Sequence, residues 1–264
     1  MLAVALRVII GLVVAYLALL VLLYLFQNRF LYPAPQDVHP PAPGFEAVQL
    51  STTDGLTLNA HWQPPEADQP SVVFFHGNAS SLAGATEATR LLATQGYGVL
   101  LVNYRGYGGN PGEPSEQGFY KDGHAAMAFL ADKGVRRART IIIGNSIGSG
   151  AATHIANQFN TGALILVSPF ASLVEVASEA MPIAPVGLLL KDRFENIEKA
   201  PDLKMPVLIQ HDTTDNVVPY SQGKRLSRAA KTSTFQSFEG SGHQLAYGTE
   251  AQIAQSEWLA EQGF

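Results

Sequence analysis

A serine, an aspartate and a histidine have the types and the order along this chain that nucleophilic hydrolysis needs. Ser146 lies in Gly144-Asn145-Ser146-Ile147-Gly148, directly after the β-branched run 141–143. A serine hydroxyl attacks a carbonyl when a base removes its proton, and a carboxylate must orient that base. Asp215 and His243 follow Ser146 and carry the two groups required. The pattern predicts a serine hydrolase with Ser146 as nucleophile, Asp215 as acid and His243 as base.

The segment around Ser146 is typical of a strand, a sharp turn and a helix. Residues 141–143 suit a buried strand, and Ala151 to Phe159 is compatible with a helix. This is the setting of a nucleophile elbow, where small neighbours permit a strained backbone at the serine. The backbone N–H of Ile147 is then free to face a developing oxyanion, so we expect Ile147 to be one oxyanion donor.

Asp215 and His243 each follow a predicted strand. The run 206–210 leads into the loop that holds Asp215, and the run 234–238 leads into Gly240-Ser241-Gly242 and His243. In α/β-hydrolases the acid and the histidine follow the nucleophile in this order, at the carboxyl ends of strands. Alone, the aspartate fits a turn residue and the histidine a surface residue. Their order and their positions after strands favour the catalytic interpretation.

Two further loops carry distinctive residues. His76-Gly77-Asn78-Ala79 follows the third predicted strand, where the second oxyanion donor of such enzymes lies, and the backbone N–H of Asn78 is our candidate. His76 is expected to hold this loop rather than act as a base. The loop 104–116 contains Arg105, for which an internal scaffold is favoured over substrate contact.

The pattern beyond residue 45 predicts one α/β domain, residues 45–264. Apolar runs of four to six residues alternate with helical stretches, which indicates a mostly parallel sheet with helices on both faces. The expected strands are 45–51, 56–62, 71–75, 98–102, 141–143, 163–167, 206–210 and 234–238, and the expected helices include 82–94, 116–132 and 249–260. The fold class is therefore the α/β-hydrolase fold, with a small cap over about 168–203 at the usual site of cap insertions.

The N-terminus predicts a single transmembrane helix over residues 1–30. Val8 to Phe26 contains no charged side chain, and at about 1.5 Å per residue it covers about 28 Å, close to the hydrocarbon thickness of a bilayer. A cleaved signal peptide is the alternative, although no Ala-x-Ala-like site follows. We expect a single-pass membrane protein, in the inner membrane if the source is bacterial. One arginine at each end leaves the orientation open. Residues 31–44 contain five prolines and suggest a stiff spacer.

Composition excludes several other classes of protein. The net charge of −5 and the absence of a basic run argue against nucleic acid as a partner. The chain has no cysteine, which excludes disulfides, thiolate metal sites and a cysteine nucleophile. Its histidines show no metal-ligand spacing, so neither a metal nor another cofactor is expected.

These motifs together resemble one family. The stretches 74–79, 104–116, 144–148 and 168–170 and the two loops with Asp215 and His243 are similar to membrane-anchored α/β-hydrolase-domain proteins. That group includes animal lysophospholipid lipases, protein depalmitoylases and many uncharacterised bacterial members. The resemblance implies a serine hydrolase that acts on esters or thioesters of lipid-like acyl chains, and it implies the same triad and oxyanion donors. Asn145 replaces an arginine common in the family, and Asp212 replaces a glycine.

Several interpretations stay open. The apolar stretch 181–190 fits either a wall of an acyl pocket that faces the membrane or an ordinary cap packed on the core. The triad serves a small or lipid-like ester, a thioester or an aminopeptidase-type amide equally well, and a non-catalytic membrane-bound module on the same fold is the alternative of another class. Asp212→Asn should cost little, or slightly shift the acid limb of the pH–rate profile by removing a nearby negative charge.

Overall fold

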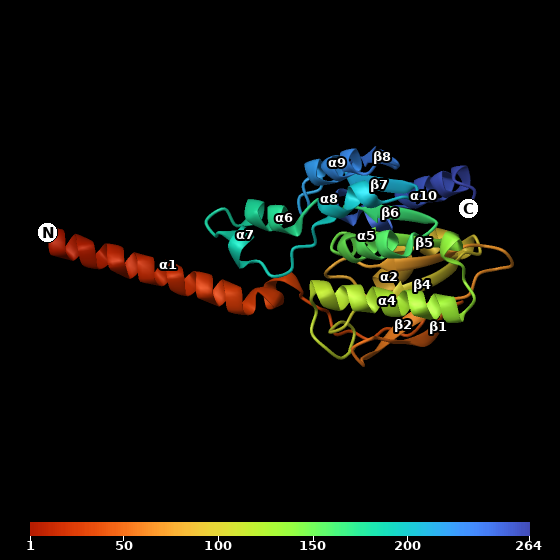
Figure 1. Ribbon diagram of the computed structural model, residues 1–264, viewed down its shortest axis with the longest axis horizontal. Helices are drawn as coiled ribbons and strands as arrows, with labels where there is room; N and C mark the ends of the chain where they lie inside the picture. The colour runs from red at the N-terminus through yellow and green to blue at the C-terminus, as the bar shows by residue number, and fades with distance from the viewer.

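The computed structural model describes all 264 residues, Met1–Phe264, as one long N-terminal helix followed by an α/β domain (Figure 1). Helix α1, Leu2–Leu31, projects from the domain as a single rod. The rest of the chain packs around one sheet, with the C-terminus at the end of the domain away from α1. The domain is therefore formed by the residues that follow α1, with little contribution from the helix itself.

One eight-stranded sheet forms the centre of the domain. Its strands are β1 (Glu46–Ser51), β2 (Thr57–Gln63), β3 (Ser71–Phe75), β4 (Gly98–Val102), β5 (Thr140–Asn145), β6 (Ala163–Val167), β7 (Val207–Asp212) and β8 (Ser233–Phe238). The spatial order is β1-β2-β4-β3-β5-β6-β7-β8, and β2 is the one strand that runs opposite to all the others. Every residue of β3 to β7 is buried, because helices cover both faces of these strands. The predicted α/β-hydrolase fold is confirmed.

Two hydrophobic cores lie on opposite faces of the sheet. The helices are α2 (Leu82–Ala88), α3 (Arg90–Thr94), α4 (Glu116–Asp132), α5 (Gly148–Phe159), α6 (Leu173–Ala180), α7 (Val186–Leu189), α8 (Asn196–Lys199), α9 (Tyr220–Ala229) and α10 (Thr249–Glu261), with 3-10 turns at Arg137–Arg139, Ala200–Asp202 and Gly242–Tyr247. Helices α4, α5 and α9 contribute to the core on one face, and α2, α3 and α10 contribute to the core on the other. This arrangement fixes the carboxyl ends of β5, β7 and β8 along one edge of the sheet.

One predicted helix is divided in two. The stretch 82–94 forms α2 and α3, which meet at Thr89. The Thr89 hydroxyl is buried and donates a hydrogen bond to the carbonyl oxygen of Ala85 at 2.9 Å. Such a bond back to the preceding turn competes with regular helix geometry, which explains the break.

The proline-rich segment after α1 follows the surface of the domain instead of standing free. Tyr32 is buried, and its hydroxyl donates to Oδ2 of Asp192 at 2.8 Å. The backbone N–H of Gly108 donates to the carbonyl oxygen of Pro35 at 2.8 Å, and Nε2 of Gln36 donates to the carbonyl oxygen of Gly106 at 2.7 Å. Prolines keep the chain extended and still offer carbonyl acceptors. The segment therefore packs along the surface of the domain, whereas we expected a free-standing spacer.

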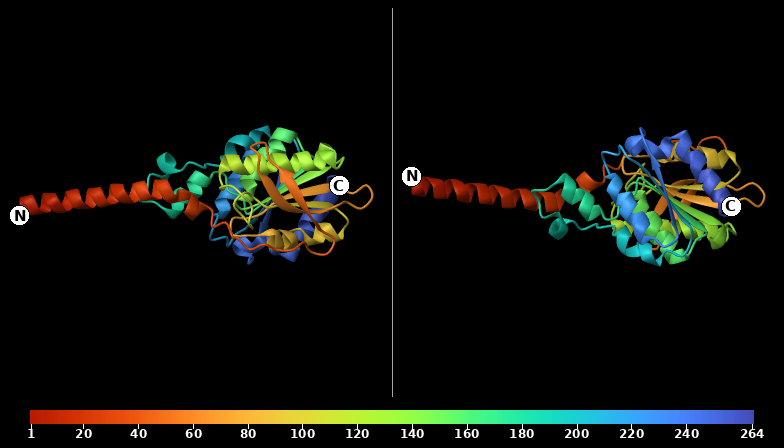
Figure 2. Two further views of the ribbon diagram at one scale, coloured as in Figure 1. Left: turned by 90° about the horizontal axis from the view of Figure 1, so that it is seen from below. Right: turned by 90° about the horizontal axis from the view of Figure 1, so that it is seen from above.

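Helices α6 and α7 lie apart from the sheet, beside the C-terminal half of α1. All three views show this segment alongside the part of α1 that is nearest the domain (Figures 1 and 2). It lies within the region where we expect a cap, 168–203, and Tyr16 and Gln27 of α1 form hydrogen bonds with it.

Candidate active site

Ser146 occupies the turn between β5 and α5 in a left-handed backbone conformation, with φ of +53°. This conformation is strained for a residue with a side chain and is typical of a nucleophile elbow. A Cβ on Gly148 would lie 2.2 Å from the carbonyl oxygen of Phe75, and a Cβ on Gly144 would lie 2.5 Å from Cβ of Ala152. The two glycines are therefore required because strand and helix approach each other too closely for any side chain.

The structure brings Ser146, His243 and Asp215 into one line of hydrogen bonds. Oγ of Ser146 lies 2.9 Å from Nε2 of His243, and Nδ1 of His243 lies 2.8 Å from Oδ2 of Asp215. A carboxylate accepts, so Nδ1 carries the proton in this arrangement and the lone pair of Nε2 faces the serine hydroxyl. This is the geometry in which an imidazole can remove a proton from a serine.

Asp215 accepts more hydrogen bonds than the one from His243. Its Oδ1 accepts from the backbone N–H groups of Val217 and Val218, both at 2.9 Å. Nε2 of His211 lies 3.0 Å from the carbonyl oxygen of Val218 and 3.4 Å from Oδ2 of Asp215. Burial alone would raise the pKa of Asp215, but hydrogen bonds from the two histidines and from Val218 lower it well below its usual value. The acid therefore stays ionised at neutral pH.

His211 is the residue near the triad that the sequence patterns did not indicate. It is fully buried in β7, four residues before Asp215, and its Nδ1 has no hydrogen-bond partner. A Cβ on Gly223 would lie 2.3 Å from that Nδ1, so helix α9 closes directly over the ring. The available signal in the sequence was a histidine inside an apolar strand, four residues before the expected acid.

Asp212 has a more important position than its sequence context suggests. It is the last residue of β7 and is fully buried. Its Oδ1 accepts from the backbone N–H of Thr214 at 2.8 Å and from the Thr214 hydroxyl at 2.6 Å, and its Oδ2 accepts from the backbone N–H of Ser241 at 2.8 Å. Asp212 thus connects the loop of Asp215 to the loop of His243. These contacts argue for a larger effect of Asp212→Asn than the small one expected from the sequence.

The two candidate oxyanion donors lie beside Ser146. The backbone N–H groups of Asn78 and Ile147 make no hydrogen bond within the chain, and both residues line the pocket that contains Ser146. The side chain of Asn78 is fixed, because its Oδ1 accepts from the Tyr107 hydroxyl at 2.7 Å and its Nδ2 donates to the carbonyl oxygen of Leu31. Two free donors beside a nucleophile are what an oxyanion hole requires.

His76 and Asn145 are buried neighbours of the site. Nδ1 of His76 donates to the carbonyl oxygen of Gly77 at 2.8 Å, and burial lowers the pKa of this histidine to about 4. His76 is therefore neutral and holds the loop, as expected. Oδ1 of Asn145 is buried without a hydrogen-bond partner. Nδ2 of Asn145 would lie 3.2 Å from a Cβ added to Gly77.

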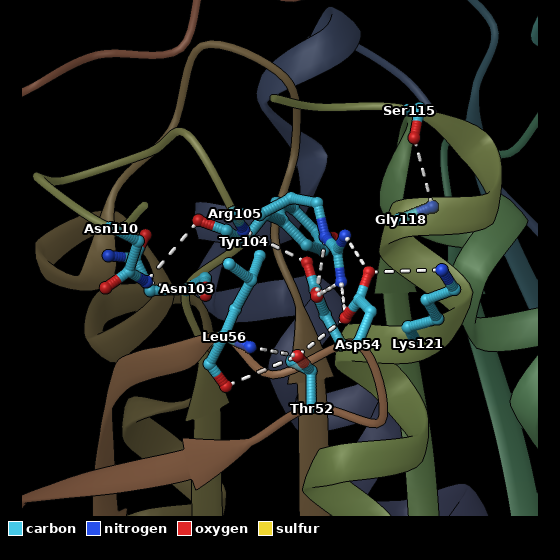
Figure 3. A network of polar contacts seen from close by, with 11 residues as sticks. Thr52, Asp54, Leu56, Asn103, Tyr104, Arg105, Asn110, Ser115, Gly118 and Lys121 are labelled. Carbon is cyan, nitrogen blue, oxygen red and sulfur yellow. Dashed lines mark hydrogen bonds and ion pairs between the residues drawn. The ribbon is translucent and has the colours of Figure 1, made fainter. Parts of the chain in front are cut away.

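Arg105 belongs to an internal network of polar contacts (Figure 3). Its guanidinium contacts Asp122 of α4 at 2.7 Å and Asp54 of the β1–β2 turn at 2.9 Å, and Nζ of Lys121 reaches the same Asp54 at 3.1 Å. The backbone N–H of Arg105 also donates to Asp122. Arg105 does not line the pocket of Ser146, so the structure supports the scaffold interpretation.

The pocket around Ser146 has a volume of about 490 Å³, within the range of small-molecule sites. Loops at the strand ends supply its polar side, including His243, Gln244 and Tyr247. Its apolar residues are Phe30, Leu31, Ala79, Ile147, Phe170, Leu173, Val176, Val217 and Val218. Apart from His243, no acidic or basic side chain lines it. Phe30 and Leu31 of α1 were not expected in the site. The only indication in the sequence was that the helix continues with apolar residues after Arg29.

The fold and this strand-end site define the class of α/β-hydrolases, and comparison with known proteins agrees. The model of the serine aminopeptidase S33 family matches residues 66–197. An uncharacterised protein of Mycobacterium tuberculosis is 35% identical over 88% of this chain and 86% of its own length. The alpha/beta hydrolase domain-containing protein WAV2 of Arabidopsis thaliana is 29% identical over 82% of this chain and 78% of its own length. This chain therefore belongs to the α/β-hydrolase family that contains these proteins.

Solved structures share the fold at lower sequence identity. The esterase Pf2001 of Pyrococcus furiosus superposes with a TM-score of 0.70 at 16% identity and covers 88% of this chain and 97% of its own. A puromycin-hydrolyzing peptidase of Mycobacterium tuberculosis gives a TM-score of 0.68 at 23% identity, covering 84% of this chain and 40% of its own. One architecture therefore carries both ester and peptide hydrolysis among these neighbours.

Proposed function

We propose that the protein is a membrane-anchored serine hydrolase that cleaves carboxylic esters through an acyl-enzyme. The observation that supports this most is the line of hydrogen bonds from Ser146 through His243 to Asp215, at 2.9 and 2.8 Å, beside two free backbone donors. Helix α1 supports the anchor, because its most apolar stretch has a mean hydropathy of 2.9 and is not buried.

The geometry accommodates each proton transfer of the reaction. His243 takes the Ser146 proton on Nε2 while Oγ attacks the ester carbonyl, and Asp215 stabilises the imidazolium. The N–H groups of Asn78 and Ile147 face the oxyanion of the tetrahedral intermediate. The intermediate expels the alcohol, which receives the proton from His243. Water then attacks the acyl-enzyme with His243 as base, and the carboxylic acid leaves.

The lining of the pocket favours an ester over an aminopeptidase substrate. An aminopeptidase must recognise a free α-ammonium group, and a carboxylate is the usual partner of such a charge. No acidic side chain lines the pocket of Ser146. A thioester makes the same demands on the triad as an ester and is the second candidate. A non-catalytic module is disfavoured, because it has no use for a free nucleophile and two free donors in one pocket.

Labelling with a fluorophosphonate tests the assignment. Wild-type protein in detergent should be labelled on Ser146 and should hydrolyse esters faster than peptides, and Ser146→Ala should abolish labelling and lower turnover about 10⁶-fold. Ser149→Ala, in the first turn of α5, is the control and should keep both. The labelled wild type should also stay in the membrane pellet after carbonate extraction. An unlabelled wild type would contradict the proposal, and a soluble one would contradict the anchor.

A further inference from the structure

An apolar groove lies between α1 and the cap. It has a volume of about 310 Å³. Its lining is Leu23, Gln27, Phe30 and Leu31 from α1 and Ala177, Met181, Ala184, Val186, Leu189 and Leu190 from the cap. Gln27 is its one polar residue, and the amide of Gln27 is already bonded to the cap. A site of this composition suits an aliphatic chain.

The groove lies next to the pocket of Ser146. Phe30 and Leu31 line both spaces, so the end of α1 forms the boundary that the two share. The carbonyl oxygen of Leu31 accepts a hydrogen bond from the side chain of Asn78, whose backbone N–H is a candidate oxyanion donor. The end of α1 is thereby attached to the loop beside the nucleophile.

The polar side chains in the apolar part of α1 point to the cap rather than outward. The Tyr16 hydroxyl donates to the carbonyl oxygen of Ile183 at 2.7 Å. Nε2 of Gln27 donates to the carbonyl oxygen of Leu189 at 3.1 Å, and its Oε1 accepts from the backbone N–H of Lys191 at 2.8 Å. In hydrocarbon every backbone polar group needs a partner within the protein. These bonds supply such partners where the cap lies alongside the helix.

The outer surface of the cap is apolar as well. Ile183 and Leu188 expose 71% and 86% of their surface. Nζ of Lys191 lies 4.4 Å from the centre of the Tyr24 ring, and a basic residue paired with a tyrosine is typical of a membrane interface. Ile183 lies beside Tyr16, and Lys191 lies beside Tyr24. The tip of the cap is therefore closer to the N-terminal end of α1 than Lys191 is.

We propose that the groove admits the acyl chain of a membrane ester sideways from the bilayer and that α1 is a wall of the substrate site. The inference rests on the proposed function, because the chain must lead to a carbonyl carbon at Ser146. It adds a substrate class, esters whose acyl chain is long and stays in lipid, and a binding role for the helix besides anchoring. Short esters reach Ser146 through the pocket without filling the groove.

Chain-length preference tests the groove in the full-length protein. The measured quantity is the ratio of kcat/KM for p-nitrophenyl dodecanoate to that for p-nitrophenyl butyrate in mixed micelles. Ala184→Trp fills the groove and should lower this ratio at least tenfold. Leu188→Trp adds the same side chain to the exposed side of α7, outside the groove, and should keep the wild-type ratio. An unchanged ratio in Ala184→Trp would overturn the proposal. A structural lipid that occupies the groove and never reacts would also leave the ratio unchanged, and the proposal would then be wrong.

A photoreactive probe tests the same proposal without any substitution. A fluorophosphonate with a hexadecyl chain that ends in a diazirine should label Ser146 and, on irradiation, crosslink to residues 16–31 of α1 or 177–190 of the cap. Crosslinks confined to the loops after β7 and β8 would overturn the groove while leaving the hydrolase intact. No labelling of Ser146 by this probe or by a short fluorophosphonate would overturn the proposed function and the groove with it.

Discussion

The two sides of the Ser146 pocket are built in different ways. On the side of β7 and β8, Asp212 and Asp215 accept hydrogen bonds from Thr214, Val217, Val218, Ser241 and His243, which fixes two loops against each other. On the side of α1 and α6, Phe30, Leu31, Leu173 and Val176 contribute only apolar surface. Hydrogen bonds define one geometry, whereas apolar contact tolerates many. The first side therefore suits the chemistry and the second suits the choice of substrate.

The largest effect should come from the acid on the hydrogen-bonded side. Asp215→Asn should lower turnover by up to about 10⁴-fold with the fold intact, because an asparagine amide favours the wrong tautomer of His243. Steady-state kinetics and circular dichroism measure the two parts of this prediction. Asp202→Asn, on an exposed turn, is the control. An active Asp215→Asn together with an inactive Asp212→Asn would exchange the roles of the two carboxylates.

A smaller loss should follow when the bond between the two loops is broken. In Asp212→Asn one side-chain oxygen becomes an NH₂ group, which accepts no hydrogen bond, so either the bonds from Thr214 or the bond from Ser241 are lost. We expect turnover to fall about 10- to 100-fold and the free energy of unfolding to fall by about 1–3 kcal/mol. Thr213→Ala changes an exposed residue of the same loop and should leave both unchanged. Wild-type turnover in Asp212→Asn would mean that the loops hold their positions without it.

The apolar side should respond in binding and not in chemistry. Val176→Ala removes two methyl groups from the wall of the pocket and should raise KM for a hexanoate ester about fivefold with kcat unchanged. Val38→Ala, at a residue with 76% of its surface exposed, is the matched control. A change in kcat of similar size would show that the apolar side also positions the reacting groups, and the contrast between the two sides would then fail.

The smallest effect should appear in the pH dependence of stability. Burial alone would raise the pKa of Asp212, but hydrogen bonds from Thr214, Ser241 and Gly242 lower it. The unfolded chain therefore binds a proton at this carboxyl first as the pH falls below about 4, and stability is lost there. Between pH 6 and pH 3 the melting temperature of Asp212→Asn should fall less steeply than that of the wild type. Parallel curves would contradict the role of this carboxylate in acid stability.

Local patterns predicted the elements that depend on local forces. The runs 71–75, 98–102 and 163–167 match β3, β4 and β6 residue for residue, because central parallel strands are continuous apolar runs. The order of Ser146, Asp215 and His243 along the chain predicted which residues the structure brings together. The motif at the elbow also predicted the position of the strained residue.

Contacts between distant segments were beyond the sequence patterns. Tyr16 and Ile183 are separated by 167 positions, and no periodicity in either segment indicates the other. The contacts of Asp212 were not predicted, because its position along the chain does not reveal which backbone N–H groups face a carboxylate. His211 was missed for the same reason, since its partners become neighbours only when β7 and the start of α9 are in place.

The attachment of α1 to the domain has a consequence for orientation. The helix has 30 residues and, at about 1.5 Å per residue, a length of about 45 Å, more than the ~30 Å of bilayer hydrocarbon. A helix that exceeds the hydrocarbon tilts, and the tilt depends on the membrane. Nδ2 of Asn28 donates to the carbonyl oxygen of Pro114 at 3.3 Å and the Tyr32 hydroxyl to Asp192 at 2.8 Å, so the C-terminal end of the helix is attached to the domain. For a chain anchored in this way, a thicker or thinner membrane would rotate the mouth of the pocket relative to the lipid surface, and the lipid composition of the host membrane would set the working angle of the enzyme.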